Sequence, residues 1–431
     1  MLRLPAITTV AFSLVLAWAR PAMAHGFGPT YDIPIPLWLY LYGAAAAVVL
    51  AFVPLALYSR KTPHADDVYE YPRFDLFGVR WLGNVLGSRL LLGGLRLLSV
   101  FLFFVVVVSG LVGLQSGFNI APTFVWITWW VGFGFFTALV GNLWPLVSPW
   151  GVLFDWAEGL ARRLGLRAGL GEAYSGALGI WPAVGLYLAF VWFENVFSGS
   201  YVPRNIAFFA LGYSLITVYA MAYFGKGTWL RHGEAFSVFF ALLGRFAPTE
   251  VRVKNTSVCQ GCDTCEPGRC VDCYACFRRA DPDERELNLR PFAVGLRLPE
   301  RAVPGVAAFV ILVLAGVTFD GLLETPLWLE VVRVTPVDQT LGVMLLPVMF
   351  FVIYLGFVRL SLVLGGGGGM GFGRFAAAYA FSLVPIAIAY QLAHYYTYLL
   401  IQGQMIFSLV SDPLGWGWNL FGTRASTPAT A

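Results

Sequence analysis

All six cysteines of this 431-residue chain lie within one eighteen-residue segment, in the order Cys-x2-Cys-x2-Cys-x4-Cys-x2-Cys-x2-Cys. Thiolates separated by two residues can turn towards the same ion, as they do in tetrahedral zinc sites and around iron–sulfur clusters. Four thiolates complete either kind of site, and six are present. We therefore predict a metal centre formed by Cys259, Cys262, Cys265, Cys270, Cys273 and Cys276.

Zinc is favoured over an iron–sulfur cluster as the occupant of these cysteines. The bacterial ferredoxin run has three residues before its last cysteine and a proline directly after it. Four residues precede Cys270, and no proline follows it. The iron–sulfur cluster stays open as an alternative, and so does a disulfide framework.

A second set of candidate residues consists of ionisable side chains in apolar surroundings. Glu194, Asp320 and His394 lie inside hydrophobic runs, where a charge is costly and therefore indicates function. Such side chains can bind Zn²⁺ or Cu²⁺, and a metal-bound water can then act as hydroxide near neutral pH. We expect Glu194, Asp320 and His394 to be catalytic, with His394 and His25 as metal ligands. The alternative is that the acids are ordinary helix-end residues and that His394 only hydrogen-bonds a neighbouring helix.

The composition shows which elements must position these residues. The chain is 58% hydrophobic and only 12% charged, with a mean hydropathy of +0.72, which excludes an ordinary soluble domain. Eight mostly uncharged windows are long enough to cross a bilayer as helices. They are residues 37–58, 90–114, 123–144, 178–197, 205–224, 302–323, 341–364 and 375–401. The predicted fold is an all-α, polytopic transmembrane bundle of about eight helices.

The first 24 residues resemble a secretory signal peptide. An apolar run is followed by Ala22-Met23-Ala24, which has the small-x-small form of a cleavage site. Cleavage would make His25 the mature N-terminus, whereas an uncleaved anchor is the alternative. With that N-terminus outside, the predicted cytoplasmic segments hold 23 Lys and Arg residues and the external segments hold three. This asymmetry predicts that both mature ends lie outside a bacterial inner membrane.

The orientation decides how the cysteines are interpreted. They fall in residues 226–301, a long polar insertion that carries twelve of the basic residues and is therefore predicted to be cytoplasmic. Clustered cysteines in that reducing compartment favour metal over disulfides. The insertion begins with an apolar stretch at 234–245, too short to span, which predicts an interfacial or re-entrant helix. The predicted organisation is thus a signal at 1–24, helices at 25–225, the insertion at 226–301, helices at 302–401 and an external tail at 402–431.

Several motifs along the chain resemble a known family. They are His25-Gly-Phe-Gly, Asp32-Ile-Pro-Ile-Pro-Leu-Trp-Leu39, Ser148-Pro-Trp150, Trp181-Pro-Ala183, Phe190-Val-Trp-Phe-Glu194, Gly233-Glu-Ala-Phe236, Thr318-Phe-Asp-Gly321, Leu392-Ala-His-Tyr395 and Asp412-Pro-Leu-Gly-Trp-Gly-Trp-Asn-Leu-Phe-Gly422. Together they resemble the bacterial multi-pass membrane proteins labelled fenitrothion hydrolase. The resemblance implies a membrane-bound hydrolase of apolar organophosphate triesters and a related membrane subunit as its partner, and it implies no established catalytic residues.

Two functions are therefore expected from the sequence. The first is hydrolysis of an organophosphate by metal-activated water at the outer face. The second is metal handling or electron transfer, with the cysteine cluster as one station and the outer histidine and carboxylates as another. The second expectation has its own support, because six cysteines on one side of a membrane contribute nothing to hydrolysis on the other.

Overall fold

The structure is a computed structural model, and it describes most of the chain from residue 70 to residue 423. The gaps are residues 167–168, 261, 263–269, 299–302, 324, 326–327, 329–334 and 365–370. Of the chain before residue 70, only Trp38, Tyr42, Ala45 and Ala46 are described. The predicted signal peptide, His25, most of the first predicted helix and Cys265 therefore lie outside the described residues.

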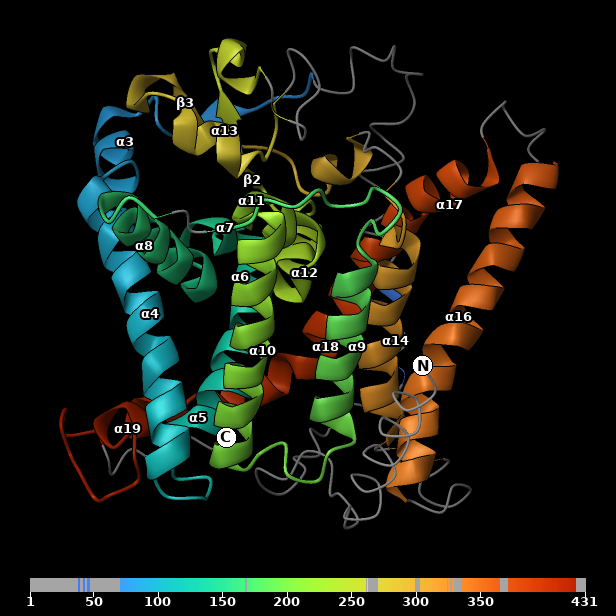
Figure 1. The fold of residues 1–431 in the computed structure, drawn as a ribbon. Helices are drawn as coiled ribbons and strands as arrows, with labels where there is room; N and C mark the ends of the chain where they lie inside the picture. The colour runs from blue at the N-terminus through green and yellow to red at the C-terminus, as the bar shows by residue number, and fades with distance from the viewer. Residues whose placement is uncertain are drawn as a thin grey trace.

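The protein is an all-α polytopic helix bundle. Six of the described helical segments are long and apolar enough to cross a membrane. They are α3–α4 (Arg80–Leu86 and Arg89–Val112); α5, η2 and α6 (Ile120–Pro122, Thr123–Phe133 and Gly134–Leu139); α10 (Pro203–Phe224); α14 (Val306–Leu323); α16 (Pro336–Leu364); and α17, η6 and α18 (Phe372–Ala380, Phe381–Leu383 and Val384–Gln402). Figure 1 shows α4, α10, α14 and α16 as upright helices, with α18 crossing obliquely behind α10.

Two of the expected spans differ from their predicted windows. The third ends at Leu139, and α7 (Trp144–Val147) and α8 (Pro149–Arg163) follow as separate short helices. The fourth, α9 (Trp181–Asn195), has 15 residues, or roughly 22 Å at 1.5 Å per residue, less than a bilayer core of about 30 Å. Local sequence explains both limits, because Gly141-Asn142 interrupts the third window and Pro182 lies in the first turn of α9.

The close crossing of α4 and α10 depends on a glycine. A Cβ placed on Gly110 would lie 2.5 Å from the carbonyl oxygen of Pro203 and 2.7 Å from the Cβ of Ala207. Small residues at such crossings let membrane helices approach closely enough for extensive van der Waals contact. Helix α4 is therefore held against α10 at a position that only glycine can occupy without a backbone shift.

We predict that Gly110→Ala lowers the free energy of unfolding by about 1–3 kcal/mol, because the added methyl group forces the two helices apart. The matched control is Gly94→Ala in the same helix, where an added Cβ meets nothing within 4 Å. Thermal denaturation of both variants in detergent measures the difference. Equal loss of stability in the two variants would contradict the proposed role of the crossing.

The apolar stretch at the start of the insertion packs inside the bundle. After α11 (Lys226–His232), helix α12 (Ala235–Gly244) has seven of its ten residues buried, including Phe236, Phe239 and Phe240. It contacts α6, α9 and α18. Helix α12 is thus packed into the bundle, and whether it is interfacial or re-entrant stays a prediction.

The remainder of the insertion forms a small subdomain at one end of the bundle, here called the cysteine subdomain (residues 249–290). Its three-stranded antiparallel sheet has the order β1–β3–β2, where β1 is Phe74–Asp75, β2 is Thr249–Val253 and β3 is Arg285–Leu289. Thr249 pairs with Leu289 and Val253 with Arg285. The short helices η3 (Thr256–Cys259), α13 (Tyr274–Arg279) and η4 (Pro282–Glu284) surround the sheet, and η5 (Val294–Arg297) leads back to α14.

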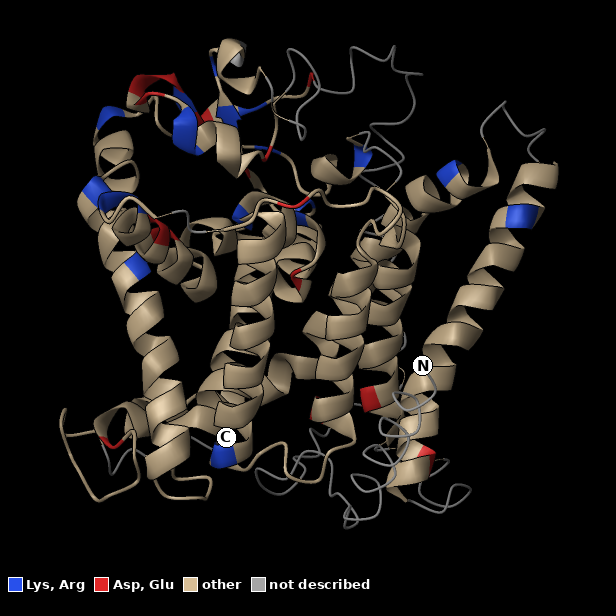
Figure 2. Ribbon diagram, in the orientation of Figure 1, with Lys and Arg blue, Asp and Glu red and all other residues tan. Residues whose placement is uncertain are grey.

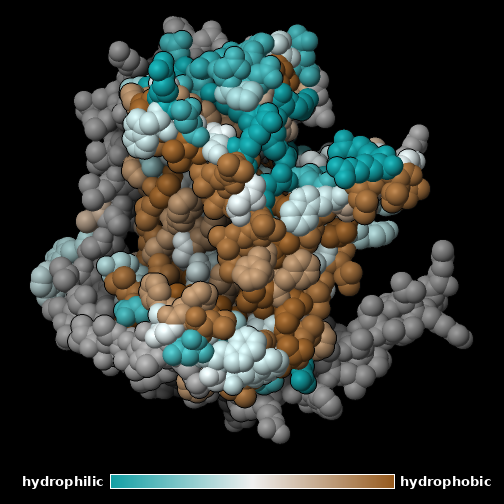
Figure 3. Space-filling model, turned by 90° about the vertical axis from the view of Figure 1, so that its left-hand side faces the viewer, coloured by the Kyte–Doolittle hydropathy of each residue, from teal (hydrophilic) through white to brown (hydrophobic). Residues whose placement is uncertain are grey.

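The two ends of the bundle differ in charge. Figure 2 shows Lys and Arg gathered at the end that carries the cysteine subdomain. Arg204 lies in the first turn of α10, at the opposite end. Between the ends, one face presents a broad apolar belt (Figure 3), which includes exposed Leu97, Phe101 and Val108 on α4. An apolar belt between polar ends is the surface that a bilayer requires.

Candidate metal centre and buried histidine–aspartate pair

Strand β2 brings the two cysteine arms together. It leads directly into η3, which ends at Cys259. The second arm returns to the same strand, because the backbone N–H of Asp272 donates to the carbonyl of Val251 over 2.9 Å and Val271 bridges to Arg252. Cys270 and Cys273 flank this anchored pair, and Cys276 follows inside α13. The chain therefore doubles back so that both arms converge on one side of the sheet.

The convergence places sulfur atoms at ligand distances. The Sγ atoms of Cys259, Cys270 and Cys276 all lie within 4.8 Å of one another, and so do those of Cys262, Cys273 and Cys276. The Sγ atoms of Cys262 and Cys273 are 3.7 Å apart, close to the edge of roughly 3.8 Å in a tetrahedron with zinc–sulfur bonds of about 2.3 Å. A disulfide would need about 2.05 Å. This partly buried cluster could hold a metal ion.

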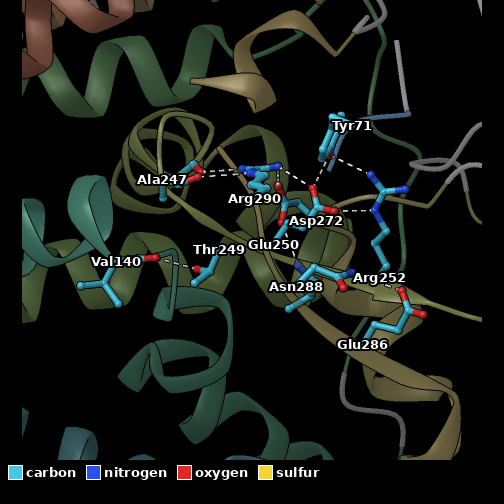
Figure 4. A network of polar contacts seen from close by, with 12 residues as sticks. Tyr71, Val140, Ala247, Thr249, Glu250, Arg252, Asp272, Glu286, Asn288 and Arg290 are labelled. Atoms are coloured by element: carbon cyan, nitrogen blue, oxygen red, sulfur yellow. Dashed lines mark hydrogen bonds and ion pairs between the residues drawn. The ribbon is translucent and has the colours of Figure 1, made fainter. Parts of the chain in front are cut away.

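An arginine at the base of the sheet ties the cysteine subdomain to the bundle. Arg290 has a fully buried side chain, whose Nη1 donates to Glu250 at 2.9 Å and to Asp272 at 3.1 Å. Its Nε donates to the carbonyl of Ala247 and its Nη2 to that of Gly244, at the end of α12. Figure 4 shows Arg290 turned towards Glu250 and Asp272, with Tyr71 and Arg252 beside them. One guanidinium therefore links helix α12, the sheet and the residue before Cys273.

The electrostatics of the network keep Arg290 and Tyr71 protonated. Burial by itself lowers the pKa of Arg290, but Asp272 and Glu250 raise it overall. Burial, reinforced by Glu250, raises the pKa of Tyr71 to about 12. Tyr71 thus keeps its proton and donates to Glu250, while Arg252 donates to the other oxygen of the same carboxylate at 2.5 Å. The Glu250 carboxylate is buried but well provided with donors.

Further contacts join the cysteine subdomain to the bundle. Tyr274, two residues from Cys276, donates to the carbonyl of Asn142, and Thr249 donates to that of Val140 over 2.6 Å. Asp155 on α8 accepts from Arg96 on α4 and from Lys226 on α11, with Arg278 of α13 at 4.0 Å. The interruption at residues 140–142 is therefore where the bundle and the subdomain meet.

At the opposite end, the structure brings two of the predicted catalytic residues together. His394 Nε2 and Asp320 Oδ2 are 2.8 Å apart, joining α18 to α14. Tyr395 donates to the same carboxylate oxygen over 2.6 Å. Asp320 is 1% exposed, whereas the His394 side chain is 24% exposed. A buried carboxylate that accepts from one ring nitrogen orients the imidazole and leaves Nδ1 as the available base or ligand.

Glu194 lies in the same region but does not complete a three-ligand set. It interacts electrostatically with Tyr395 and Tyr398, as Asp320 also does. Within the part of the chain that the structure describes, the groups of three or more close metal-ligand atoms consist of cysteines and do not include Glu194, Asp320 or His394. Among the described residues of the predicted outer site, only His394 and Asp320 therefore form a close pair.

Comparison of the chain with protein-family models, with curated proteins and with solved structures found no match. The resemblance to the fenitrothion hydrolase family therefore stays a prediction. The roles of the residues rest on their geometry.

Sequence reasoning missed several residues of both sites. Tyr395 and Arg290 were not singled out, because the first adjoins a histidine in an aromatic run and the second is one of many basic residues in the insertion. Glu234 caps α12: its carboxylate accepts from the backbone N–H groups of Phe236 and Ser237 at 2.9 and 2.7 Å. A signal for Glu234 was available in its position just before an apolar helix.

An apolar cavity of about 360 Å³ lies elsewhere, between α4, η2, α10 and the short helices α7 and α8. Its walls are largely aromatic and include Trp129, Trp144 and Trp150. Neither His394 nor Asp320 lines it. The cavity and the histidine–aspartate pair are thus separate features of the bundle.

Proposed function

We propose that this protein is a metal-binding membrane protein whose cysteine subdomain binds zinc through thiolates. The observation that carries the proposal is the convergence of five cysteine sulfurs, from two arms of the chain, to distances within 4.8 Å inside each set of three. Zinc prefers thiolate sites of this kind, and sites built from cysteine alone are closed and structural. The ion would hold both arms against β2 and so stabilise the subdomain on the bundle.

The proposed location is a bacterial inner membrane, with the cysteine subdomain in the cytoplasm. The excess of Lys and Arg at that end of the bundle supports this orientation. A cleaved signal peptide would place the mature N-terminus, and with it the histidine–aspartate end, on the outer side. Reducing conditions in the cytoplasm keep cysteines available as thiolates.

The metal content of full-length protein purified in detergent tests the proposal. We expect zinc at one or more equivalents per chain, in a colourless preparation. A brown preparation containing iron and acid-labile sulfide would instead favour the electron-transfer alternative. Protein that contains no metal and has its cysteines paired as disulfides would contradict both the zinc site and the electron-transfer alternative.

The histidine–aspartate pair supports a second candidate function, hydrolysis of an apolar organophosphate triester. In this proposal His394 takes a proton from water at Nδ1, while Asp320 stabilises the resulting imidazolium. The hydroxide attacks phosphorus and a nitrophenolate leaves. A zinc or copper ion bound by His394 and His25 would be the metal-assisted form of the same reaction. A related membrane subunit, which the family resemblance implies, would be a partner of either form.

We predict that Asp320→Asn lowers kcat for release of nitrophenol from fenitrothion by about 100-fold or more, because the imidazole loses its orienting carboxylate. The matched control is Asp338→Asn, since Asp338 contacts only Thr335 in the described structure. Nitrophenol absorbance is followed with and without a chelator. This function would be excluded if the unmodified protein were inactive both with and without the chelator. It would also be excluded if the two variants were equally active.

A further inference from the structure

The five described cysteines divide into two sets of three that share one member. The first set is Cys259, Cys270 and Cys276, and the second is Cys262, Cys273 and Cys276. The sets follow the sequence pattern, because each of them takes one cysteine from the same position in each arm. Cys259 and Cys270 begin the two Cys-x2-Cys-x2-Cys arms, and Cys262 and Cys273 stand second. Only Cys276 belongs to both.

This division does not match a single tetrahedral ion. Around one zinc ion with four thiolates, all four sulfurs lie roughly 3.8 Å from one another. Among the cysteines that the structure describes, the mutually close sulfurs form groups of three, and no group of four lies within 4.8 Å. Two neighbouring ions that share one sulfur would produce the two overlapping sets.

We propose that the cysteine subdomain binds two divalent, thiophilic ions and that the Sγ atom of Cys276 bridges them. This inference rests on the proposed thiolate centre and adds its nuclearity. Each ion then has three thiolate ligands from the described residues, with the third shared. The site is built as a pseudo-symmetric pair, with one ion held by the first cysteines of the arms and the other by the second cysteines.

The position of Cys276 suits a bridging ligand. It is completely buried, whereas Cys262 and Cys273 are only partly buried. Its carbonyl accepts from the N–H of Ala280, which fixes the residue inside α13. Tyr274 in the first turn of that helix is itself tied to Asn142 of the bundle. A rigid, central thiolate can serve two ions, while peripheral thiolates serve one each.

The binding step requires no oxidant or reductant. Each ligating thiol gives its proton to solvent and becomes a thiolate, and the ions keep their charge. Loading of the five described cysteines therefore releases up to five protons. The bridging sulfur forms two metal–sulfur bonds, and every other sulfur forms one.

The number of ions per chain in full-length protein tests this inference. We expect two equivalents of zinc and no acid-labile sulfide. One equivalent would overturn the two-ion site while leaving the thiolate centre in place, and absence of metal would overturn both. Two iron atoms with labile sulfide would also overturn it, because sulfide and not Cys276 would then be the bridge.

Cobalt substitution tests the bridge itself. Co²⁺ is added stepwise to chelator-treated protein, and the paramagnetic signal should rise with the first equivalent and fall with the second, as the two ions couple through the shared sulfur. Cys262→Ser should keep about one ion, whereas Cys276→Ser should lose both. Retention of the same number of ions by the two variants, or a signal that rises in proportion to both equivalents, would refute a bridging role for Cys276.

Discussion

Cys276→Ser is expected to remove the bound metal and to unfold the cysteine subdomain while leaving the helix bundle intact. Metal binding contributes folding free energy directly in small thiolate domains, with apparent values of about 10–16 kcal/mol for structural zinc. Cys276 is completely buried and belongs to both sets of sulfur ligands. Replacing Cys276 should therefore disturb the metal site more than replacing any exposed residue of the subdomain.

Limited proteolysis combined with metal analysis measures this effect. Cleavage should become rapid between residues 249 and 290, while fragments of the bundle remain protected. The control is Ser257→Ala, because the Ser257 side chain is exposed in η3, where its backbone N–H donates to Asn255 Oδ1 and its carbonyl accepts from Gln260. A Cys276→Ser protein with native metal content and native protease resistance would show that this cysteine is not a ligand.

Arg290→Met is expected to lower the free energy of unfolding by about 3–5 kcal/mol, because it removes one partner of a buried ion pair. Glu250 and two backbone carbonyls would lose a donor in a region without solvent. Arg279→Met is the control, since Arg279 is an exposed residue at the end of α13. Thermal denaturation in detergent should show a large shift for the first variant and almost none for the second.

A double variant separates the ion pair from simple packing. Replacement of both partners, Glu250→Leu with Arg290→Met, removes the buried charge that the single variant leaves behind. The double variant should therefore be less destabilised than the sum of its single changes. Strict additivity would indicate that Arg290 contributes through Asp272 and the carbonyls of Ala247 and Gly244, and not through Glu250.

The helix bundle and the cysteine cluster were predictable because each has a strong local signal. Long apolar windows predict helices by length alone, and cysteine spacing predicts shared coordination. The break at Gly141-Asn142 and the burial of α12 were harder to predict. Both depend on contacts with distant segments, such as those of Tyr274 with Asn142 and of Arg290 with Gly244.

The two candidate sites also differ in how far sequence could define them. The cost of a charge in the membrane singled out Asp320 and His394, and the structure places these side chains 2.8 Å apart. Tyr395 could not be assigned in this way, because the direction of a side chain on α18 depends on how that helix packs against α14. Which cysteine sulfurs lie close to one another also depends on how the second cysteine arm returns to β2.

The most direct test of the thiolate centre is X-ray absorption at the metal edge of the full-length protein. The structure predicts a first shell dominated by sulfur at about 2.3 Å, the distance of zinc–thiolate bonds. The histidine–aspartate end of the bundle would contribute nitrogen and oxygen at about 2.0–2.1 Å instead. A sulfur shell would support the zinc–thiolate centre, and a first shell of nitrogen and oxygen alone would contradict it.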